Sequence, residues 1–138
     1  MSEKNYNLVI TDPAKSDLAE IKSYTIQQHG EAAFEAYSTL IKQALHDLTQ
    51  DPVRAGSKAR PEISEDTRSY HIGLSKQRAD SPVKSPKHFV LYYVHKNDDL
   101  LINGVLHESR DIERRISDRM VEHNFEVKRD GPSRGRSR

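Results

Sequence analysis

Two apolar segments joined by a short polar turn constrain the fold of this chain more than any other feature. The first is 88–94 (HFVLYYV), the second is 100–107 (LLINGVLH), and turn-forming residues occupy the positions between them. The first segment is rich in β-branched and aromatic residues, and the second is rich in leucine with an isoleucine and a valine. Together they predict two strands paired in an antiparallel hairpin. In the first segment both alternating sets of side chains are apolar, so we expect a central strand covered on both faces.

The two faces of the second strand are predicted to differ, because side chains alternate along a strand. The set expected to meet helices comprises Leu100, Ile102 and Leu106, and Gly104 would allow those helices a close approach. The other set is mixed in polarity and is expected to stay open to a partner. This mixed set comprises Leu101, Asn103, Val105 and His107.

The N-terminal part of the chain predicts a strand followed by a helical hairpin. An apolar run at 6–11 (YNLVIT) predicts the strand, and Asp12-Pro13 supplies an N-cap and a proline at the first helical position. Apolar residues then recur every three or four positions as far as Gly30, and again over 31–50. Two amphipathic helices joined at a glycine need a common apolar partner, most simply a sheet.

The rest of the chain predicts one more strand, two irregular segments, a last helix and a tail. Residues 68–72 (RSYHI) predict the strand, whereas 53–66 and the low-hydrophobicity segment 73–87 predict loops, the latter a flexible insertion. A short helix is expected near 112–124. Residues 126–138 are basic, lack core residues and are predicted to be disordered.

The predicted fold class is therefore α+β. An N-terminal strand and an α-helical hairpin pack on a small, mainly antiparallel sheet, with a short C-terminal helix. Residues 1–125 are expected to form one domain, since 138 residues of which 34% are hydrophobic bury only one modest core. The absence of cysteine excludes disulfides and thiolate chemistry and suits a reducing compartment. No signal peptide or membrane span is visible, so a cytoplasmic protein is expected.

Charge is divided unevenly along the chain, although the net charge is only +1. Residues 1–66 carry 7 basic and 11 acidic side chains, whereas residues 67–138 carry 15 basic and 10 acidic ones. A basic second half suits an anionic partner such as an acidic protein segment or nucleic acid. Alternatively, basic residues simply gather in a loop and a tail.

Known cofactor and metal motifs are missing from the sequence. The seven histidines form no HExxH or HxH pattern, and no glycine-rich phosphate loop or G-x-S-x-G elbow occurs. We therefore expect neither a metal nor a cofactor.

One group of residues near the end of the last predicted strand could take part in catalysis. His107 and Arg110 lie there, and Arg68 belongs to a strand that could lie nearby. Histidine and arginine suit metal-free RNA cleavage, which needs an acid, a base and a cation to stabilise the phosphorane charge. The structural interpretation is equally open: Arg110 could pair with Asp111 or cap the last helix, and His107 could be a packing residue.

The order strand, helical hairpin, three strands and short helix accompanies the motifs RSYHIG, HFVLYYV and GVLHESRDIERRI. This combination resembles the RelE/ParE superfamily of type II toxins, and its ParE branch most closely. The resemblance runs over 6–116. Its most specific element is VLHESRDIERRI (105–116), because a VLHxxRD pattern that closes the sheet is typical of ParE-like toxins.

The resemblance implies a toxin that acts without enzymatic activity. A ParE-like toxin would inhibit DNA gyrase, cause growth arrest and take part in plasmid stabilisation. It would be neutralised by a ParD-like or other acidic antitoxin in a hetero-oligomeric complex. Arg68, His107 and Arg110 would then contact the target, and the mixed set of the last strand would bind the antitoxin.

The superfamily also implies an alternative, a ribosome-dependent mRNA endonuclease with His107, Arg68 and Arg110 as catalytic residues. Phe89 stands where such endonucleases place an arginine, just before the apolar core of the strand at 88–94, and this favours the non-enzymatic branch. The segment 73–87 also departs from the tight hairpin usual in the family. A further alternative is an inactive homologue that serves only as an antitoxin-binding co-repressor.

Overall fold

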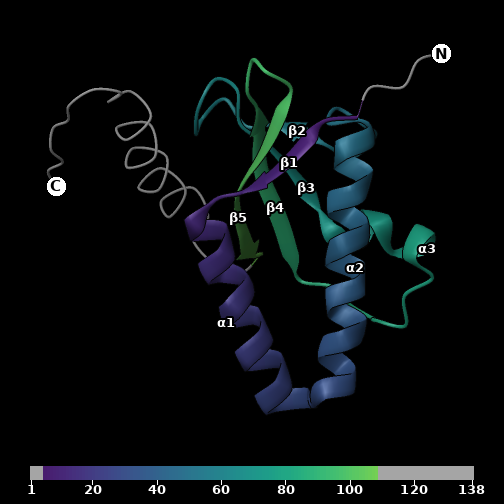
Figure 1. The fold of residues 1–138 in the computed structure, drawn as a ribbon. Coiled ribbons are helices and arrows are strands. Elements are labelled where there is room, and N and C mark those ends of the chain that lie inside the picture. The colour runs from purple at the N-terminus through teal and green to yellow at the C-terminus, as the bar shows by residue number, and fades with distance from the viewer. Residues whose placement is uncertain (1–4, 109–138) are drawn as a thin grey trace, which may run out of the picture.

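The computed structural model describes residues 5–108. Within this range a five-stranded sheet of order β1-β5-β4-β3-β2 carries two long helices on one face (Figure 1). β1 pairs in parallel with β5, and all other neighbouring strands pair antiparallel. The strands are β1 (Asn7–Ile10), β2 (Lys58–Ala59), β3 (Arg68–His71), β4 (His88–Val94) and β5 (Asp99–His107). The helices are α1 (Asp12–His29), α2 (Glu31–Gln50), the 3-10 helix η1 (Ile72–Ser75) and α3 (Lys76–Ala79).

This arrangement confirms the predicted α+β class, the helical hairpin and the central position of β4. The short strand β2 lies in the region 53–66, which was expected to be a loop throughout. The C-terminal helix expected near 112–124 and the tail at 126–138 lie outside the described residues. Among residues 5–108, no helix is both long and apolar enough to cross a membrane.

The first helix begins with a cap that differs from the predicted one. Thr11, not Asp12, is the N-cap, so Pro13 is the second residue of the helix and not the first. The Thr11 hydroxyl oxygen accepts a hydrogen bond from the backbone N–H of Ala14 at 3.4 Å and donates one to the carbonyl of Ile102 at 2.8 Å. One side chain thus caps α1 and joins it to β5.

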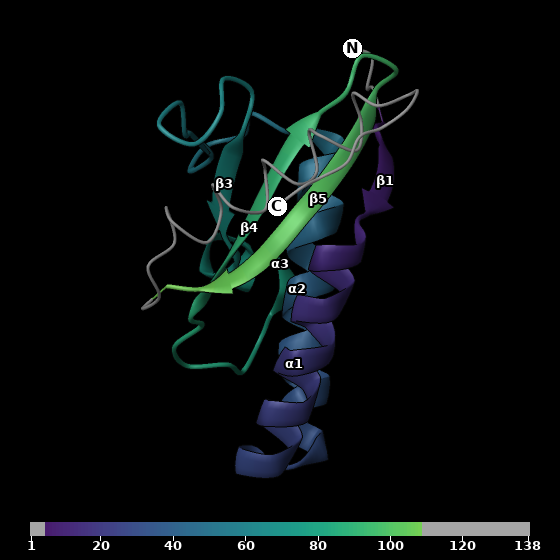
Figure 2. The same cartoon turned by 90° about the vertical axis from the view of Figure 1, so that its left-hand side faces the viewer.

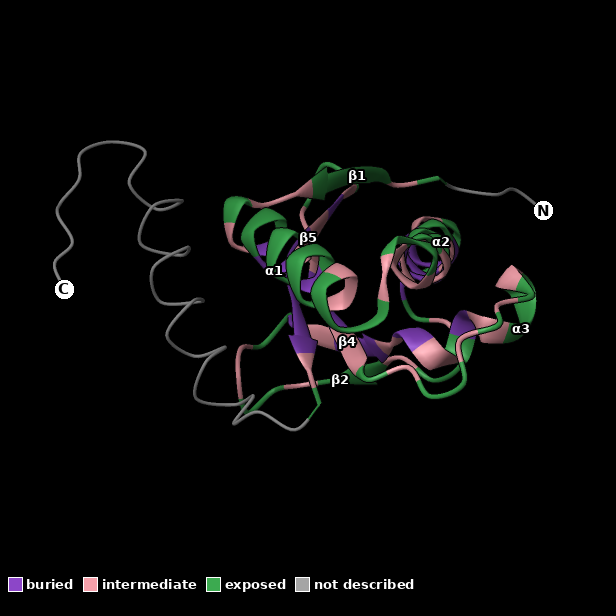
Figure 3. Cartoon of the chain, turned by 90° about the horizontal axis from the view of Figure 1, so that it is seen from below, coloured by how far each residue is buried: buried purple, intermediate pink, exposed green. Residues whose placement is uncertain are grey.

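The main hydrophobic core lies between the helical hairpin and the sheet. Figure 3 shows buried residues on the sides of α1 and α2 that face the sheet, and along β4 and β5. The closed end of the hairpin extends past the end of the sheet (Figures 1 and 2). The core residues of the hairpin are Ala14, Ile21, Leu40, Ile41, Ala44, Leu45 and Leu48, and those of the sheet include Tyr70, Val90, Tyr92, Leu100, Ile102 and Val105.

A β-bulge interrupts the pairing of β5 with β4. Leu91 pairs with Gly104, whereas the next residue of β4, Tyr92, pairs with Ile102. Asn103 is therefore an extra residue on β5. Because side chains alternate with a period of two, one extra residue reverses the faces of all residues beyond it.

The bulge corrects the predicted faces of the last strand. Leu100 and Ile102, which precede the bulge, pack under the helices as expected. Beyond the bulge, Val105 also packs under the helices, whereas Leu106 joins Leu91 in a second buried cluster on the opposite face. The prediction that Leu106 faces the helices and Val105 faces a partner is therefore wrong.

Gly104 has a different role from the one expected. Its cross-strand partner Leu91 belongs to the second cluster, so Gly104 lies on the sheet face remote from α1 and α2. It does not allow those helices a closer approach. β4 itself is covered on both faces as predicted, with Val90 and Tyr92 in the main core and Leu91 in the second cluster.

The segment predicted as an irregular insertion, 73–87, begins with helical structure. η1 and α3 pack on α2. There Asp47 is fully buried and accepts hydrogen bonds from Ser75 (2.6 Å), Gln43 (2.9 Å) and Arg78 (3.0 Å). Burial alone would raise the pKa of Asp47, but the three donors outweigh it and hold the pKa below its usual range. The carboxylate thus fastens this segment to the hairpin, and the flexibility of 73–87 stays a prediction.

Replacing Asp47 with alanine should destabilise the protein by about 3 kcal/mol, because the buried hydroxyl of Ser75 and the guanidinium of Arg78 lose their acceptor. Urea unfolding of the full chain followed by circular dichroism measures the effect. Glu35→Ala, at an exposed position of the same helix, is the control and should change the free energy of unfolding by less than about 0.5 kcal/mol. Equal effects of the two changes would contradict the role given to Asp47.

Candidate functional site

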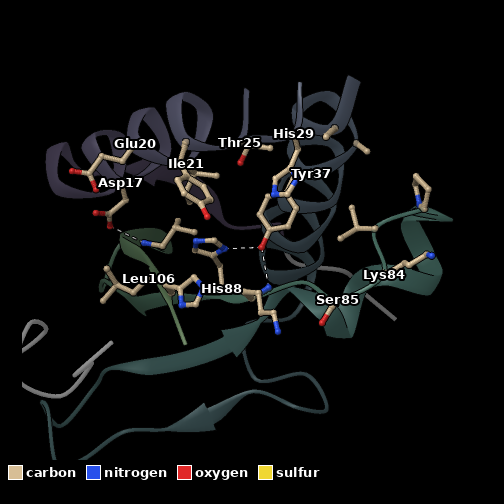
Figure 4. A pocket seen from close by; sticks show the side chains of 18 of the residues that line it. Asp17, Glu20, Ile21, Thr25, His29, Tyr37, Lys84, Ser85, His88 and Leu106 are labelled. Atoms are coloured by element: carbon tan, nitrogen blue, oxygen red, sulfur yellow. Dashed lines mark hydrogen bonds between the residues drawn. The ribbon is translucent and has the colours of Figure 1, made fainter. Parts of the chain in front are cut away.

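An open groove of about 1250 Å³ lies between the helical hairpin and one end of the sheet. The hairpin forms one wall, the ends of β4 and β5 form the floor, and residues 82–85 form the opposite wall (Figure 4). The groove exists because the hairpin extends past the sheet and because the bulge turns the last residues of β5 toward the helices. Its floor residues include His88, Val105 and His107.

A chain of hydrogen bonds crosses the groove floor from α2 to β4. The backbone N–H of Lys87 donates to the Tyr37 hydroxyl oxygen at 2.9 Å, and that hydroxyl lies 2.6 Å from Nδ1 of His88. Since the tyrosine oxygen accepts from Lys87, its own proton is available to donate to His88. Nδ1 of His88 is then the acceptor, and its Nε2 carries the proton.

The environment of His88 keeps its ring neutral at neutral pH. Burial, helped by the neighbouring His107 and His71 that repel a positive charge, lowers the pKa of His88 to about 4. The rings of His88 and His107 meet edge to face with centroids 5.2 Å apart. A neutral ring at this position agrees with its role as acceptor for Tyr37. Burial also raises the pKa of the Tyr37 hydroxyl.

A histidine–glutamate pair, His71 with Glu108, lies at the same end of the sheet. The backbone N–H of Gly73 donates to Nδ1 of His71 at 3.0 Å, so Nε2 of that ring carries a proton and donates to Glu108 at 2.9 Å. The hydrogen bond from His71 lowers the pKa of the Glu108 carboxyl. The end of β5 is thereby held to the end of β3.

A buried carboxylate joins α1 to the strand beyond the bulge. Asp17 is 5% exposed, and its Oδ2 accepts a hydrogen bond from the backbone N–H of Val105 at 2.9 Å. This hydrogen bond holds α1 against the end of β5. Asp17 occupies a position within the apolar face of its helix, between Ala14 and Ile21, so the signal for a buried polar residue was present in the sequence.

The structure does not bring Arg68 and His107 together. Arg68 pairs with Tyr92 and His107 pairs with His88, so the two lie four residues apart along β4, roughly 13 Å. The Arg68 guanidinium instead donates to the hydroxyl (2.7 Å) and the carbonyl (3.3 Å) of Ser57. The predicted catalytic constellation of Arg68, His107 and Arg110 therefore does not form within residues 5–108, and Arg110 lies outside them.

The mixed set of β5 does not form one open face. Asn103 and Val105 are each only 2% exposed, whereas Leu101 and His107 are half-buried. The bulge places His107 in the groove and leaves Leu101 paired with Val9, on the face away from the helices. The expectation of a shared open surface is wrong for this reason, while the role of the individual residues in antitoxin binding stays a prediction.

The groove brings together side chains that the sequence did not single out. Tyr37 lies within the helix that was predicted over 31–50, and His88 was treated as the first residue of a strand. Their contact joins residues 51 positions apart and has no local signature. Chemically, the groove offers neutral imidazole, lysine and apolar surface. Within residues 5–108, no group of three or more His, Asp or Glu side chains is arranged to hold a metal ion.

A protein-family comparison matches residues 8–112 to the ParE toxin of the type II toxin-antitoxin system, parDE. The chain belongs to the ParE toxin family. The match includes both walls and the floor of the groove, and it agrees with the RelE/ParE-like α+β fold. The protein is therefore a toxin of a type II toxin–antitoxin system.

Among solved structures, this ParE-family toxin is similar to a chain of the toxin-antitoxin complex RelBE2 from Mycobacterium tuberculosis. The identity is 19% and the TM-score is 0.47, and the alignment covers 75% of this chain and 98% of the other. No curated protein sequence matches the chain.

We expect His88 to make the stability of this toxin pH-dependent. Its pKa is about 4 in the folded protein and near 6.5 when unperturbed, so the unfolded state takes up the proton first as the pH falls. The contribution of His88 to stability is thus complete above pH 6.5 and is lost between pH 6.5 and about 4.

The variant His88→Asn, whose amide oxygen keeps an acceptor for Tyr37, tests this. Between about pH 7.5 and about pH 5, its free energy of unfolding should fall by up to about 2 kcal/mol less than that of the original protein. Urea unfolding at the two pH values measures the difference. His46→Asn, at an exposed histidine of α2, serves as the control. An identical pH dependence of His88→Asn and the original protein would contradict the assignment.

Proposed function

We propose that this toxin inhibits DNA gyrase by binding it, without cleaving nucleic acid itself, and that an acidic antitoxin neutralises it. The observation that carries this proposal is the separation of Arg68 from His107 by four residues of β4. Metal-free RNA cleavage needs a cation close to the acid and base that act on the same phosphate. Arg68 is committed to Ser57 at the other end of the strand.

The position of Phe89 supports the same branch. When the chain is aligned by its resemblance to the superfamily, the endonucleases have an arginine at this position. Here Phe89 packs on the second cluster and meets the ring of His71 edge to face, with centroids 5.3 Å apart. An aromatic side chain there contributes packing to the sheet and supplies no charge for phosphate. Of the predicted target contacts, His107 lines the groove, whereas Arg68 holds the loop that contains Ser57.

An endonuclease remains the second candidate because of one observation. His88 and His107 lie side by side at the groove floor, and Lys87 lines the same groove. Two imidazoles and an ammonium group are chemically able to act as base, acid and cation in RNA cleavage. In this form Lys87 would supply the cation in place of Arg68, and His88 would act with His107 as acid and base.

Purified toxin should reduce supercoiling of relaxed plasmid DNA by gyrase and increase the amount of cleaved DNA trapped on the enzyme. The proposed mechanism requires binding alone, so the effect should saturate with toxin concentration and disappear when the cognate antitoxin is added first. Agarose gels of the plasmid topoisomers measure both effects. Unchanged supercoiling together with no trapped cleavage complex would refute the proposal.

A parallel assay separates the two candidates. The toxin is added to ribosomes translating a defined mRNA, and the message is mapped by primer extension. Gyrase inhibition predicts an intact message. Cleavage that depends on ribosomes and disappears in His107→Ala would instead establish the endonuclease.

A further inference from the structure

The turn that follows α2, residues 51–57, is held in place by side chains of the sheet. The buried hydroxyl of Tyr92 donates to the carbonyl of Pro52 at 2.6 Å and lies 2.7 Å from the hydroxyl of Ser57. The Arg68 guanidinium donates to both the hydroxyl and the carbonyl of Ser57. One residue of β3 and one of β4 thus fix the turn relative to the sheet.

The turn also packs closely against η1. Gly56 has a φ of +91°, a left-handed conformation that favours glycine, and a Cβ atom at this position would lie 2.6 Å from Cδ1 of Leu74. At the start of the turn, the backbone N–H of Val53 donates to the carboxylate of Asp51 at 3.2 Å. Because these contacts order the turn before any partner arrives, little conformational entropy remains to be lost on binding.

This closely held turn presents an apolar side chain to solvent. Val53 is 64% exposed, the largest exposed fraction among the large apolar side chains of residues 5–108, and Leu74 is 49% exposed. The hydrogen bonds that fix the turn therefore do not serve to bury Val53 in the core. A rigid loop that carries exposed apolar side chains is typical of a binding surface.

Two arginines lie beside this apolar surface, and both bind Asp47. Arg54 donates to the Asp47 carbonyl at 3.2 Å, and Arg78 donates to the carboxylate at 3.0 Å. Asp47 is fully buried, whereas the side chain of Arg78 is 56% exposed. Asp51 is the exposed carboxylate of the turn and already accepts from Val53. A guanidinium has more N–H donors than these bonds use, so both arginines can also donate to carboxylates of a partner.

The turn and the groove lie at opposite ends of α2. Figure 1 shows the closed end of the helical hairpin at the bottom and the C-terminal end of α2 at the top. Among the described residues that line the groove, none belongs to 51–57. The turn is therefore a second surface, separate from the groove.

We propose that the toxin binds gyrase through this turn surface, which comprises Val53, Arg54, Leu74 and Arg78. The complementary surface on gyrase is an acidic protein segment: its carboxylates pair with the two arginines, and an apolar side chain packs on Val53 and Leu74. Phosphates of DNA would also attract the arginines, but they would gain nothing from the apolar pair, so a protein partner is favoured. Arg68 then acts as a positioning residue for the turn. This inference rests on the proposed inhibition of gyrase.

The test measures binding of the purified full-length toxin to purified gyrase without DNA, by biolayer interferometry. Val53→Asp should raise Kd at least about tenfold, because it removes an apolar contact and repels the partner's carboxylates. Arg54→Gln, whose amide keeps a donor for the Asp47 carbonyl, should raise Kd by about threefold to tenfold because a charged hydrogen bond is lost.

Two control variants make the same kinds of change elsewhere. Leu8→Asp introduces a carboxylate at an apolar side chain of β1 that is 42% exposed, and Lys15→Gln removes a positive charge at an exposed position of α1. Both should change Kd by less than about twofold. Circular dichroism and urea unfolding verify that all four variants are folded.

The outcomes separate this inference from the function on which it rests. If the unchanged toxin does not bind gyrase, the proposed inhibition fails and the inference fails with it. If it binds and both turn variants bind equally well, gyrase inhibition stands and the turn surface is ruled out. If the unchanged toxin binds duplex DNA alone, and Arg54→Gln weakens this binding while Val53→Asp does not affect binding to gyrase, the arginines form a phosphate site, which also overturns the inference.

Discussion

The β-bulge at Asn103 determines the arrangement of the candidate site. One extra residue on β5 reverses the alternation beyond it, so that Val105 and His107 turn toward the helices. The backbone N–H of Val105 then reaches the buried carboxylate of Asp17, which positions α1 over the end of the sheet. Without the bulge, His107 would lie on the opposite face and the groove would have a different floor.

The elements of the fold were predictable because each has a local pattern, whereas the bulge was not. The hairpin of α1 and α2, the cap region with Pro13 and the boundaries of β4 follow from periodicity and turn residues. The sequence LLINGVLH, by contrast, has apolar residues in both alternating sets, so its hydrophobic pattern does not reveal a reversal of faces within the strand. The sheet face on which each residue beyond Asn103 lies depends on contacts with α1, which is far away in the sequence.

Buried carboxylates and contacts between residues far apart in the chain account for the other differences between the sequence-based predictions and the structure. Asp17 and Asp47 both interrupt apolar helical faces, and such positions indicate a buried polar residue with partners elsewhere. The sequence does not identify those partners, since Val105 and Ser75 lie on other elements. The same reason applies to Tyr37 and His88. Arg68 was expected near His107 because the sequence does not give the register in which its strand pairs with β4.

The structure also changes how the charge of the chain is interpreted. The basic excess of the second half was assigned either to an anionic partner or to a flexible loop and a tail. Lys84 and Lys87 belong to a segment that Asp47 and Tyr37 hold to α2, so part of that excess lies at the groove. Glu20, from the acidic half, lies on the other wall of the same groove. A charge in a fixed position discriminates between partners, whereas a charge on a mobile loop mainly accelerates encounter.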